Sequence, residues 1–196
     1  MNVFYLHEDP RVCAEMHCDT HASKMCVEYA QLMSTAHRVT DGKLWYGRTS
    51  NGRKIARYFL NDGELNDSLY KASHINHPSN IWTRSSSSNY LWLYDMWCNL
   101  CSEFEYRYGK RHKSFVDLEL SLLMPPMNIK EDAFAEPPPA MKSFPDCIVK
   151  NDSIASYRNY YWQAKRDFAK WTKRDKPEWW NERERIETKT PVCVTE

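Results

Sequence analysis

Apolar residues recur at helical spacing along most of this chain. Between residues 10 and 38 they form one stripe, which consists of Met25, Tyr29, Leu32, Met33 and Ala36. Asp9 followed by Pro10 is a typical helix start, because Asp accepts N–H hydrogen bonds at the N-cap and Pro has no N–H to leave unpaired. The pattern therefore predicts one long helix over residues 10–38 with this stripe against the core.

Five further helices are predicted after residue 77. Pro78 opens a short one, and the serines at 85–88 separate it from a longer helix that ends at Gly109. A helix over residues 114–124 ends before two prolines, another covers residues 152–174, and the last begins at Pro177. The apolar stripe of the 152–174 segment comprises Tyr157, Tyr161, Ala164, Phe168 and Trp171.

The remaining segments have other patterns. Residues 2–6 read as a short strand, and residues 43–60 alternate around the turn signal "SNG", which predicts a β-hairpin. Residues 60–71 are expected to be loop, and the proline-rich residues 125–147 a stiff surface loop. The expected fold is mainly α: a single helical domain over residues 1–196 with a short N-terminal strand and a small hairpin, and a frayed tail at 188–196.

Composition narrows the class of protein. The 196 residues are 42% hydrophobic, and no apolar run approaches the roughly 18 residues that a membrane span needs. The N-terminus lacks the layout of a signal peptide, and the seven cysteines are odd in number, so reduced thiols are expected. These features predict a cytoplasmic protein without a membrane partner.

The polar face of the first helix is a candidate catalytic site. His17, His21, Lys24 and Glu28 recur at helical spacing, which would align four titratable groups. Neutral histidines there would serve as general bases. Two other interpretations stay open: the histidines bind a divalent metal with ligands from later in the chain, or they merely cover the helix. No cofactor is predicted beyond that metal.

A second group has the chemistry of a substrate-binding site for an anionic, flat ligand. The stretch "HINHPSNIWTRSSSSNYLW" combines a proline-led helix start, a cation and aromatic rings. The predicted substrate-binding residues are His74, His77, Trp82, Arg84, Asn89 and Tyr90.

Basic residues mark two candidate nucleic-acid contacts. Residues 158–176 hold seven Lys or Arg against two Asp, with aromatic residues between them. Such a strip is typical of nucleic-acid binding, although a solvated helix face has the same composition. The predicted nucleic-acid-binding residues are Arg107, Lys110, Arg111, Arg158, Lys165, Arg166, Lys170 and Lys173.

Four ordered blocks resemble a family of small proteins from tailed bacteriophages. They are "HCDTHASKM", "SHINHPSNIWTRSSSSNYLWL", "EYRYGKRHK" and "YRNYYWQAKRDFAKWTKRDKPEWW", and they leave out the hairpin and the proline-rich segment. The chain departs from the family pattern at Ala22 and Ser23, where two aliphatic residues are usual. These phage proteins are in turn similar to helical enzymes of DNA base hypermodification, including amino acid:DNA transferases.

The resemblance implies an enzyme that acts on hypermodified thymine in phage DNA, inside the infected host cell. An amine or amino acid would displace a phosphate from an activated 5-hydroxymethyl-pyrimidine, with a histidine as base and the target base flipped from the stack. The alternatives are a nucleic-acid glycosylase or hydrolase, a nuclease with a histidine-bound metal, and a non-enzymatic phage protein that binds DNA or a host protein.

Overall fold

The computed structural model describes residues 1–189 and is mainly α-helical, as predicted. Within this range it contains eight α-helices and one antiparallel hairpin. The helices are α1 (Pro10–Glu15), α2 (Asp19–Asp41), α3 (Gly63–Ser68), α4 (Pro78–Thr83), α5 (Ser87–Tyr108), α6 (Lys113–Leu122), α7 (Ser153–Lys165) and α8 (Glu178–Lys189), and the strands are β1 (Lys43–Arg48) and β2 (Lys54–Phe59). None of the helices in the described part of the chain is long and apolar enough to cross a membrane.

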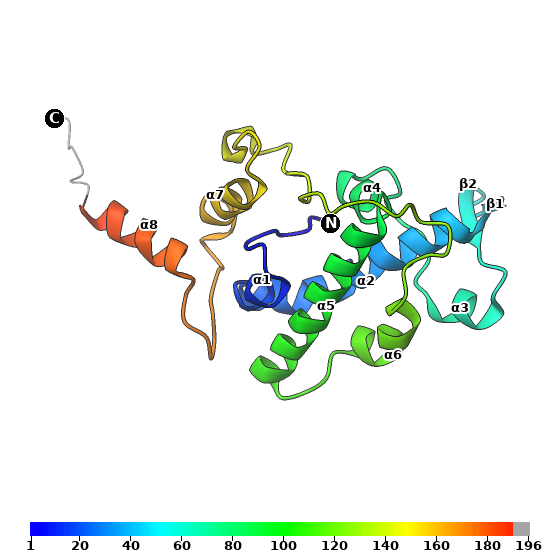
Figure 1. Ribbon diagram of the computed structural model, residues 1–196, viewed down its shortest axis with the longest axis horizontal. Coiled ribbons are helices and arrows are strands. Elements are labelled where there is room, and N and C mark those ends of the chain that lie inside the picture. The colour runs from blue at the N-terminus through cyan, green and yellow to red at the C-terminus, as the bar shows by residue number, and fades with distance from the viewer. Residues whose placement is uncertain (190–196) are drawn as a thin grey trace.

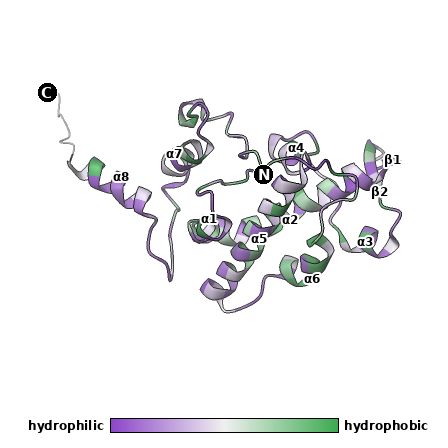
Figure 2. Ribbon diagram, in the orientation of Figure 1, coloured by the Kyte–Doolittle hydropathy of each residue, from purple (hydrophilic) through white to green (hydrophobic). Residues whose placement is uncertain are grey.

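Helices α2 and α5 cross at the centre of the molecule (Figure 1). The apolar stripes predicted for both are buried, and they pack together with α1 and α6. Polar groups in this core are paired: the Trp97 indole donates to the Cys26 carbonyl at 2.7 Å, and the Ser114 hydroxyl donates to the same oxygen at 2.9 Å. In Figure 2 the hydrophobic residues of α2, α5 and α6 meet in this central region, whereas α8 is largely hydrophilic.

The prediction of one helix over residues 10–38 is wrong, because the chain breaks at residues 16–18. Three carbonyls that a continuous helix would use accept hydrogen bonds from distant side chains instead. The Arg107 guanidinium donates to the carbonyls of Glu15 at 3.0 Å and His17 at 2.8 Å. The Trp171 indole donates to the carbonyl of Met16 at 3.0 Å. The backbone N–H of Asp19 donates to Lys170 at 2.8 Å, and α2 begins there.

Residues 2–6 do not form the expected strand. They are extended and buried, but no strand lies beside them, so their backbone groups bond to side chains. The N–H of Phe4 donates to the Tyr29 hydroxyl at 3.1 Å, and the Leu6 carbonyl accepts from Arg158 at 3.0 Å. The segment therefore lies between α2 and α7 without a neighbouring strand (Figure 1).

The predicted helix over residues 152–174 ends early. Helix α7 stops at Lys165, and the chain then turns so that Trp171 enters the core. Thr172 donates to Asp19 from both its N–H and its hydroxyl, which fixes this non-helical path. The loop expected over residues 60–71 also contains a short helix, α3, which is capped by the Asp62 carboxylate.

The other predicted elements are present. The hairpin, α4, α5 with left-handed Gly109, α6 and a helix after Pro177 agree with the sequence pattern. Residues 125–147 are irregular apart from isolated turns and a 3-10 helix, Pro145–Cys147. Residues 188 and 189 still belong to α8, and the rest of the expected frayed tail lies outside the described residues.

The buried Arg107 should dominate the stability of the α1–α2 junction. Its side chain is fully buried between Glu103 at 2.7 Å and Asp19 at 2.9 Å. Removing one member of such a group leaves the others buried and unpaired, so Arg107→Ala should lower the free energy of unfolding by about 3–5 kcal/mol. Urea unfolding monitored by circular dichroism measures this loss.

Arg111→Ala is the matched control. It removes a half-exposed ion pair to Glu119, at 3.2 Å, for which the expected loss is below about 1 kcal/mol. Equal losses for the two variants would contradict the assignment of Arg107 as the residue that holds the junction.

Candidate functional site

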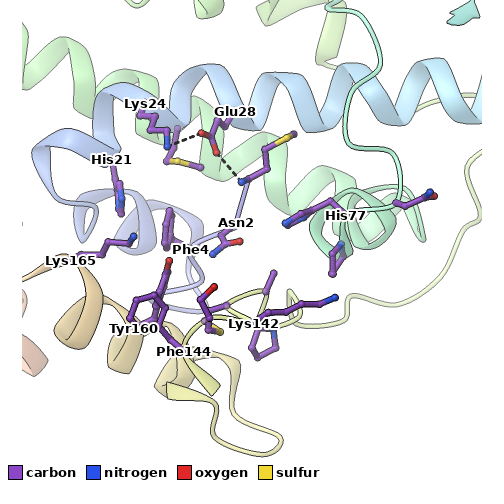
Figure 3. A pocket seen from close by; sticks show the side chains of 18 residues that line it. Asn2, Phe4, His21, Lys24, Glu28, His77, Lys142, Phe144, Tyr160 and Lys165 are labelled. Atoms are coloured by element: carbon purple, nitrogen blue, oxygen red, sulfur yellow. Dashed lines mark ion pairs between the residues drawn. The ribbon is translucent and has the colours of Figure 1, made fainter. Parts of the chain in front are cut away.

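A cavity of about 580 Å³ opens between the N-terminal segment, α2, the start of α4, the proline-rich segment and α7. Side chains from all five converge on it (Figure 3). Lys24 and Glu28 lie on one side, Tyr160 and Lys165 on the opposite side, and His77 at the end toward α4. The cavity is therefore assembled from segments far apart in the sequence, and it is the candidate functional site.

The charges around this cavity favour an anionic ligand. Glu28 is the one carboxylate that lines it, and Lys24 lies 3.2 Å from Glu28. The chain's N-terminal ammonium lies 3.5 Å from the same carboxylate. Lys142 and Lys165 also line the cavity, and no carboxylate of the described residues lies within 4 Å of either ammonium group. Two unneutralised ammonium groups at one concave site raise the local concentration of anions.

Stacked rings form one wall of the cavity. Phe4 stacks on His21 with ring centroids 4.3 Å apart and on Tyr160 at 6.3 Å, and the two interplanar angles are 18° and 12°. Phe144 packs against Tyr160 at 5.3 Å, and the Lys165 ammonium lies 4.6 Å from the Tyr160 ring centroid. A wall of this kind, beside free cations, suits a flat aromatic ligand that carries a negative charge.

His21 contributes a neutral imidazole to the cavity. Burial lowers its pKa to about 2, and the neighbouring His17, Lys165 and Lys24 act in the same direction. Its Nδ1 is hydrogen-bonded to the Tyr161 hydroxyl at 2.5 Å. Its Nε2 has no hydrogen-bond partner among the described residues, so this atom is the one available to a ligand.

The expected alignment of four groups on one helix is wrong for His17. This residue precedes α2 and is fully buried, where its ring nitrogens bond to the Cys13 carbonyl at 2.8 Å and the Tyr29 hydroxyl at 2.9 Å. Burial lowers its pKa to about 4. Both ring nitrogens form hydrogen bonds within the core, so His17 has a structural role. His21, Lys24 and Glu28 line the cavity.

The six predicted substrate-binding residues do not lie at one site. His77 lines the cavity and caps α4, since its Nδ1 accepts from the N–H of Ser79 at 3.2 Å. Three of the others hold the fold. The Trp82 indole donates to Ala135, the Asn89 side chain bonds to Trp82 and Ala135, and the Tyr90 hydroxyl donates to Leu122.

The last two of these six residues lie away from the cavity lining. His74 is exposed, has a positive φ of 49°, and borders a different hollow together with Arg57 and Lys71. Arg84 ends α4, where burial lowers its pKa, and one of its guanidinium nitrogens is buried without a hydrogen-bond partner. The two predicted groups therefore do not form one cleft: of His17, His21, His77 and Arg84, only His21 and His77 line the cavity.

Most of the predicted nucleic-acid-binding residues are used within the fold. Arg107 is buried, Arg158 donates to the Leu6 carbonyl, and Arg166 makes two hydrogen bonds of 2.9 Å to Glu187. The Lys173 ammonium donates to Tyr106, and Arg111 pairs with Glu119. Lys110 and Lys170 are exposed, and Lys165 belongs to the cavity. Because α7 ends at Lys165, these side chains do not form one helical strip.

The sequence pattern did not mark most of the lining residues as parts of a site, among them the cationic and aromatic ones, Phe4, Lys142, Phe144 and Tyr160. Phe4 reads as an ordinary apolar strand residue, and Lys142 and Phe144 lie in a segment without periodicity. Nothing local marks them, because they become neighbours only through packing. No group of three or more His, Cys, Asp or Glu that could hold a metal ion occurs among residues 1–189.

The buried His17 should make stability depend on pH. Its pKa of about 4 in the folded protein lies below the unfolded value, so the unfolded state binds the extra proton first as the pH falls. Stability should therefore be highest above about pH 6.5 and should fall by up to about 1.4 kcal/mol per pH unit down to about pH 4. Urea unfolding across this range, compared between the natural protein and His17→Gln, measures the contribution, and the variant should show the smaller slope.

Titration of His17 followed by nuclear magnetic resonance checks the cause. Its imidazole signals should stay those of the neutral ring at pH 6. A His17 midpoint near 6.5 in the folded protein, or identical slopes for the two proteins, would contradict the prediction.

No family model, curated protein sequence or solved structure matches this chain. The resemblance to phage proteins therefore stays a prediction from the sequence motifs. The cavity combines one carboxylate, one neutral imidazole, a stacked aromatic wall and two ammonium groups that have no carboxylate partner among residues 1–189.

Proposed function

We propose that this protein is an enzyme acting on a phosphorylated pyrimidine of phage DNA, and that the cavity beside α2 is its active site. The observation that carries the proposal is the pairing of free ammonium groups with an aromatic wall around a single carboxylate. We further propose that it works in the cytoplasm of the infected cell, as the sequence resemblance implies.

Substrate binding would use both the ammonium groups and the aromatic wall of the cavity. The phosphate on the base would lie against Lys165, and a backbone phosphate against Lys142 toward the His77 end of the cavity (Figure 3); neither ammonium has a carboxylate within 4 Å in the described part of the chain. The pyrimidine ring would pack on Tyr160 and Phe144. A base inside a duplex cannot reach such a wall, so the nucleotide would leave the stack.

The reaction would be displacement at the exocyclic methylene carbon of the base. The nitrogen lone pair of an amine forms the new C–N bond, and the C–O bond to the phosphate breaks with its electron pair going to the leaving phosphate. The proton lost by the amine would pass to the Glu28 carboxylate, and Lys165 would stabilise the charge that develops on the departing phosphate.

His21 is better suited to positioning than to proton abstraction. A pKa of about 2 makes the imidazole a weak base, whereas its Nε2, which has no hydrogen-bond partner among the described residues, can hydrogen-bond to a bound substrate. This revises the predicted role of the histidines, and Glu28 becomes the proposed general base.

An activity assay would distinguish a hydrolase and a non-enzymatic binding protein from the proposed transferase, and the hydrogen bonds of His17 argue against a metal-dependent nuclease. A glycosylase or hydrolase would use Glu28 to activate water, and a binding protein would give no product. A nuclease with His17 and His21 as metal ligands would need ring nitrogens that His17 already uses for Cys13 and Tyr29.

Anion binding can be measured without any reaction. We expect thymidine monophosphate to bind, as followed by isothermal titration calorimetry, and thymidine to bind much more weakly. The double variant Lys142→Ala/Lys165→Ala should lower affinity for the monophosphate about 10- to 100-fold, which corresponds to one charge-assisted hydrogen bond.

Lys150→Ala is the control for that measurement. It removes an exposed cation of the same kind, outside the cavity, and should leave affinity unchanged. Equal affinity for thymidine and its monophosphate would exclude the proposed phosphate site.

The chemical role of Glu28 can be tested on an oligonucleotide that contains phosphorylated 5-hydroxymethyl-uracil, mixed with an amine and followed by mass spectrometry. Glu28→Gln should slow formation of the amine adduct about 10²- to 10⁴-fold while monophosphate binding persists. Glu105→Gln, an exposed carboxylate on α5, should react at the normal rate.

The product distinguishes the reaction classes. Release of free base or of the hydroxymethyl base without an amine would indicate a hydrolase. Absence of any product from the natural protein, across a panel of amines, would contradict the transferase assignment.

A further inference from the structure

The β1–β2 hairpin carries several cations and no carboxylate. Residues 43–59 include five Lys or Arg and no Asp or Glu, namely Lys43, Arg48, Arg53, Lys54 and Arg57. None of these five forms an ion pair with a carboxylate of the described residues, in contrast to the cations of the 158–176 segment. Their charges are therefore available to a polyanion.

Large apolar side chains on the same hairpin are exposed. Trp45 and Tyr46 are 56% and 55% exposed, and Phe59 is 47% exposed. The strand register places Trp45, Arg57 and Phe59 on one face and Tyr46 and Lys54 on the other, where the Lys54 ammonium lies 4.1 Å from the Tyr46 ring centroid. Each face thus presents aromatic rings beside cations.

A hollow of about 350 Å³ lies where the hairpin joins the rest of the molecule. Trp45, Phe59, Arg57 and Lys71 line it, and Asp67 is its one acidic residue. A ring lying against Trp45 there would have cations within the same hollow.

The hairpin is held as a defined arm. The buried Arg38 donates to the Tyr58 carbonyl at 3.0 Å and to Tyr70, Asn66 and Leu69, which ties β2 to the following loop. The Trp45 ring lies over Gly47, where an added Cβ would be 2.5 Å from the ring. The indole of Trp45 can therefore lie in this position only because residue 47 has no side chain.

We propose that the hairpin binds single-stranded nucleic acid, with its cations on the phosphates and Trp45 and Tyr46 stacking on unpaired bases. Interleaved cations and exposed rings are the combination by which single strands are held without sequence preference. A strongly apolar protein partner would leave five cations facing it without counter-charges, so the polynucleotide is the occupant that the charge favours.

This inference rests on the proposed function and adds the surface that holds the rest of the strand. The hairpin follows the C-terminal end of α2, and His21 lies near the other end (Figure 1). The twenty residues from His21 to Asp41 span about 30 Å at 1.5 Å per residue, which corresponds to about nine nucleotides at stacked spacing. A strand bound by the hairpin can therefore present a nucleotide some distance along it to the cavity.

The test measures binding of a fluorescent oligothymidine of about 15 nucleotides by anisotropy at several salt concentrations. The charge reversal Arg53→Glu/Lys54→Glu should weaken binding at least tenfold and reduce the slope of log K against log salt by about 1.4, because two phosphate contacts are lost. Arg11→Glu/Lys150→Glu changes the net charge equally at exposed positions elsewhere and should have little effect.

The stacking part of the proposal has its own variant. Trp45→Ala/Tyr46→Ala should weaken binding about 5- to 150-fold per ring while the salt slope stays as in the natural protein. Circular dichroism of each variant confirms the fold, and binding of thymidine monophosphate should persist in all of them, since the cavity lies at the other end of α2. Unchanged monophosphate binding in the cavity variants would overturn the proposed function and leave the hairpin proposal standing.

Three results would overturn the hairpin proposal. The first is equal weakening by the control charge reversal, which would indicate a general charge effect. The second is unchanged oligonucleotide affinity in both hairpin variants. The third is a hairpin-dependent preference for duplex DNA, for an acidic protein or for anionic lipid vesicles over the single strand.

Discussion

The guanidinium of Arg107 is the interaction on which the arrangement of the candidate site depends. It is fully buried, and it joins α5 to the carboxylate of Asp19 and to the carbonyls of Glu15 and His17. These contacts replace the helical hydrogen bonds that would continue α1 into α2. Because the chain breaks there, His17 turns into the core and His21 begins the face of α2 that lines the cavity.

The cavity keeps its positive charge, whereas neighbouring cations outside it form ion pairs with carboxylates. The cations of residues 166–176 are largely engaged with Glu103, Glu184 and Glu187, whereas Lys142 and Lys165 face a hollow that contains one carboxylate. Two surfaces of the described chain are thus left with uncompensated positive charge, the cavity and the hairpin. They lie near opposite ends of α2, and the proposal that a strand held by the hairpin reaches the cavity depends on this placement.

Much of the secondary structure was predictable because its causes are local. The stripes of α2 and α5, the cap at Asp9, the left-handed Gly109 and the turn between β1 and β2 depend on residues a few positions apart. The errors arose where distant groups compete with local preference. Trp171 and Thr172 leave the helical pattern to bond with Met16 and Asp19, and Phe4 to Leu6 use side chains in place of a strand partner.

The sequence by itself determined the helical class, the hairpin with its unopposed cations, and the spacing that places His21, Lys24 and Glu28 on one face. Only the tertiary structure decided that His17 is buried with both ring nitrogens bonded, that Trp82 and Asn89 hold the proline-rich segment while Tyr90 bonds to α6, and that Lys142, Tyr160 and Phe144 complete the cavity. The physical reason is that periodicity records which face of an element is apolar. Burial, by contrast, is set by the partner that covers that face, and for His21 and Trp171 the partner lies more than a hundred residues away along the chain.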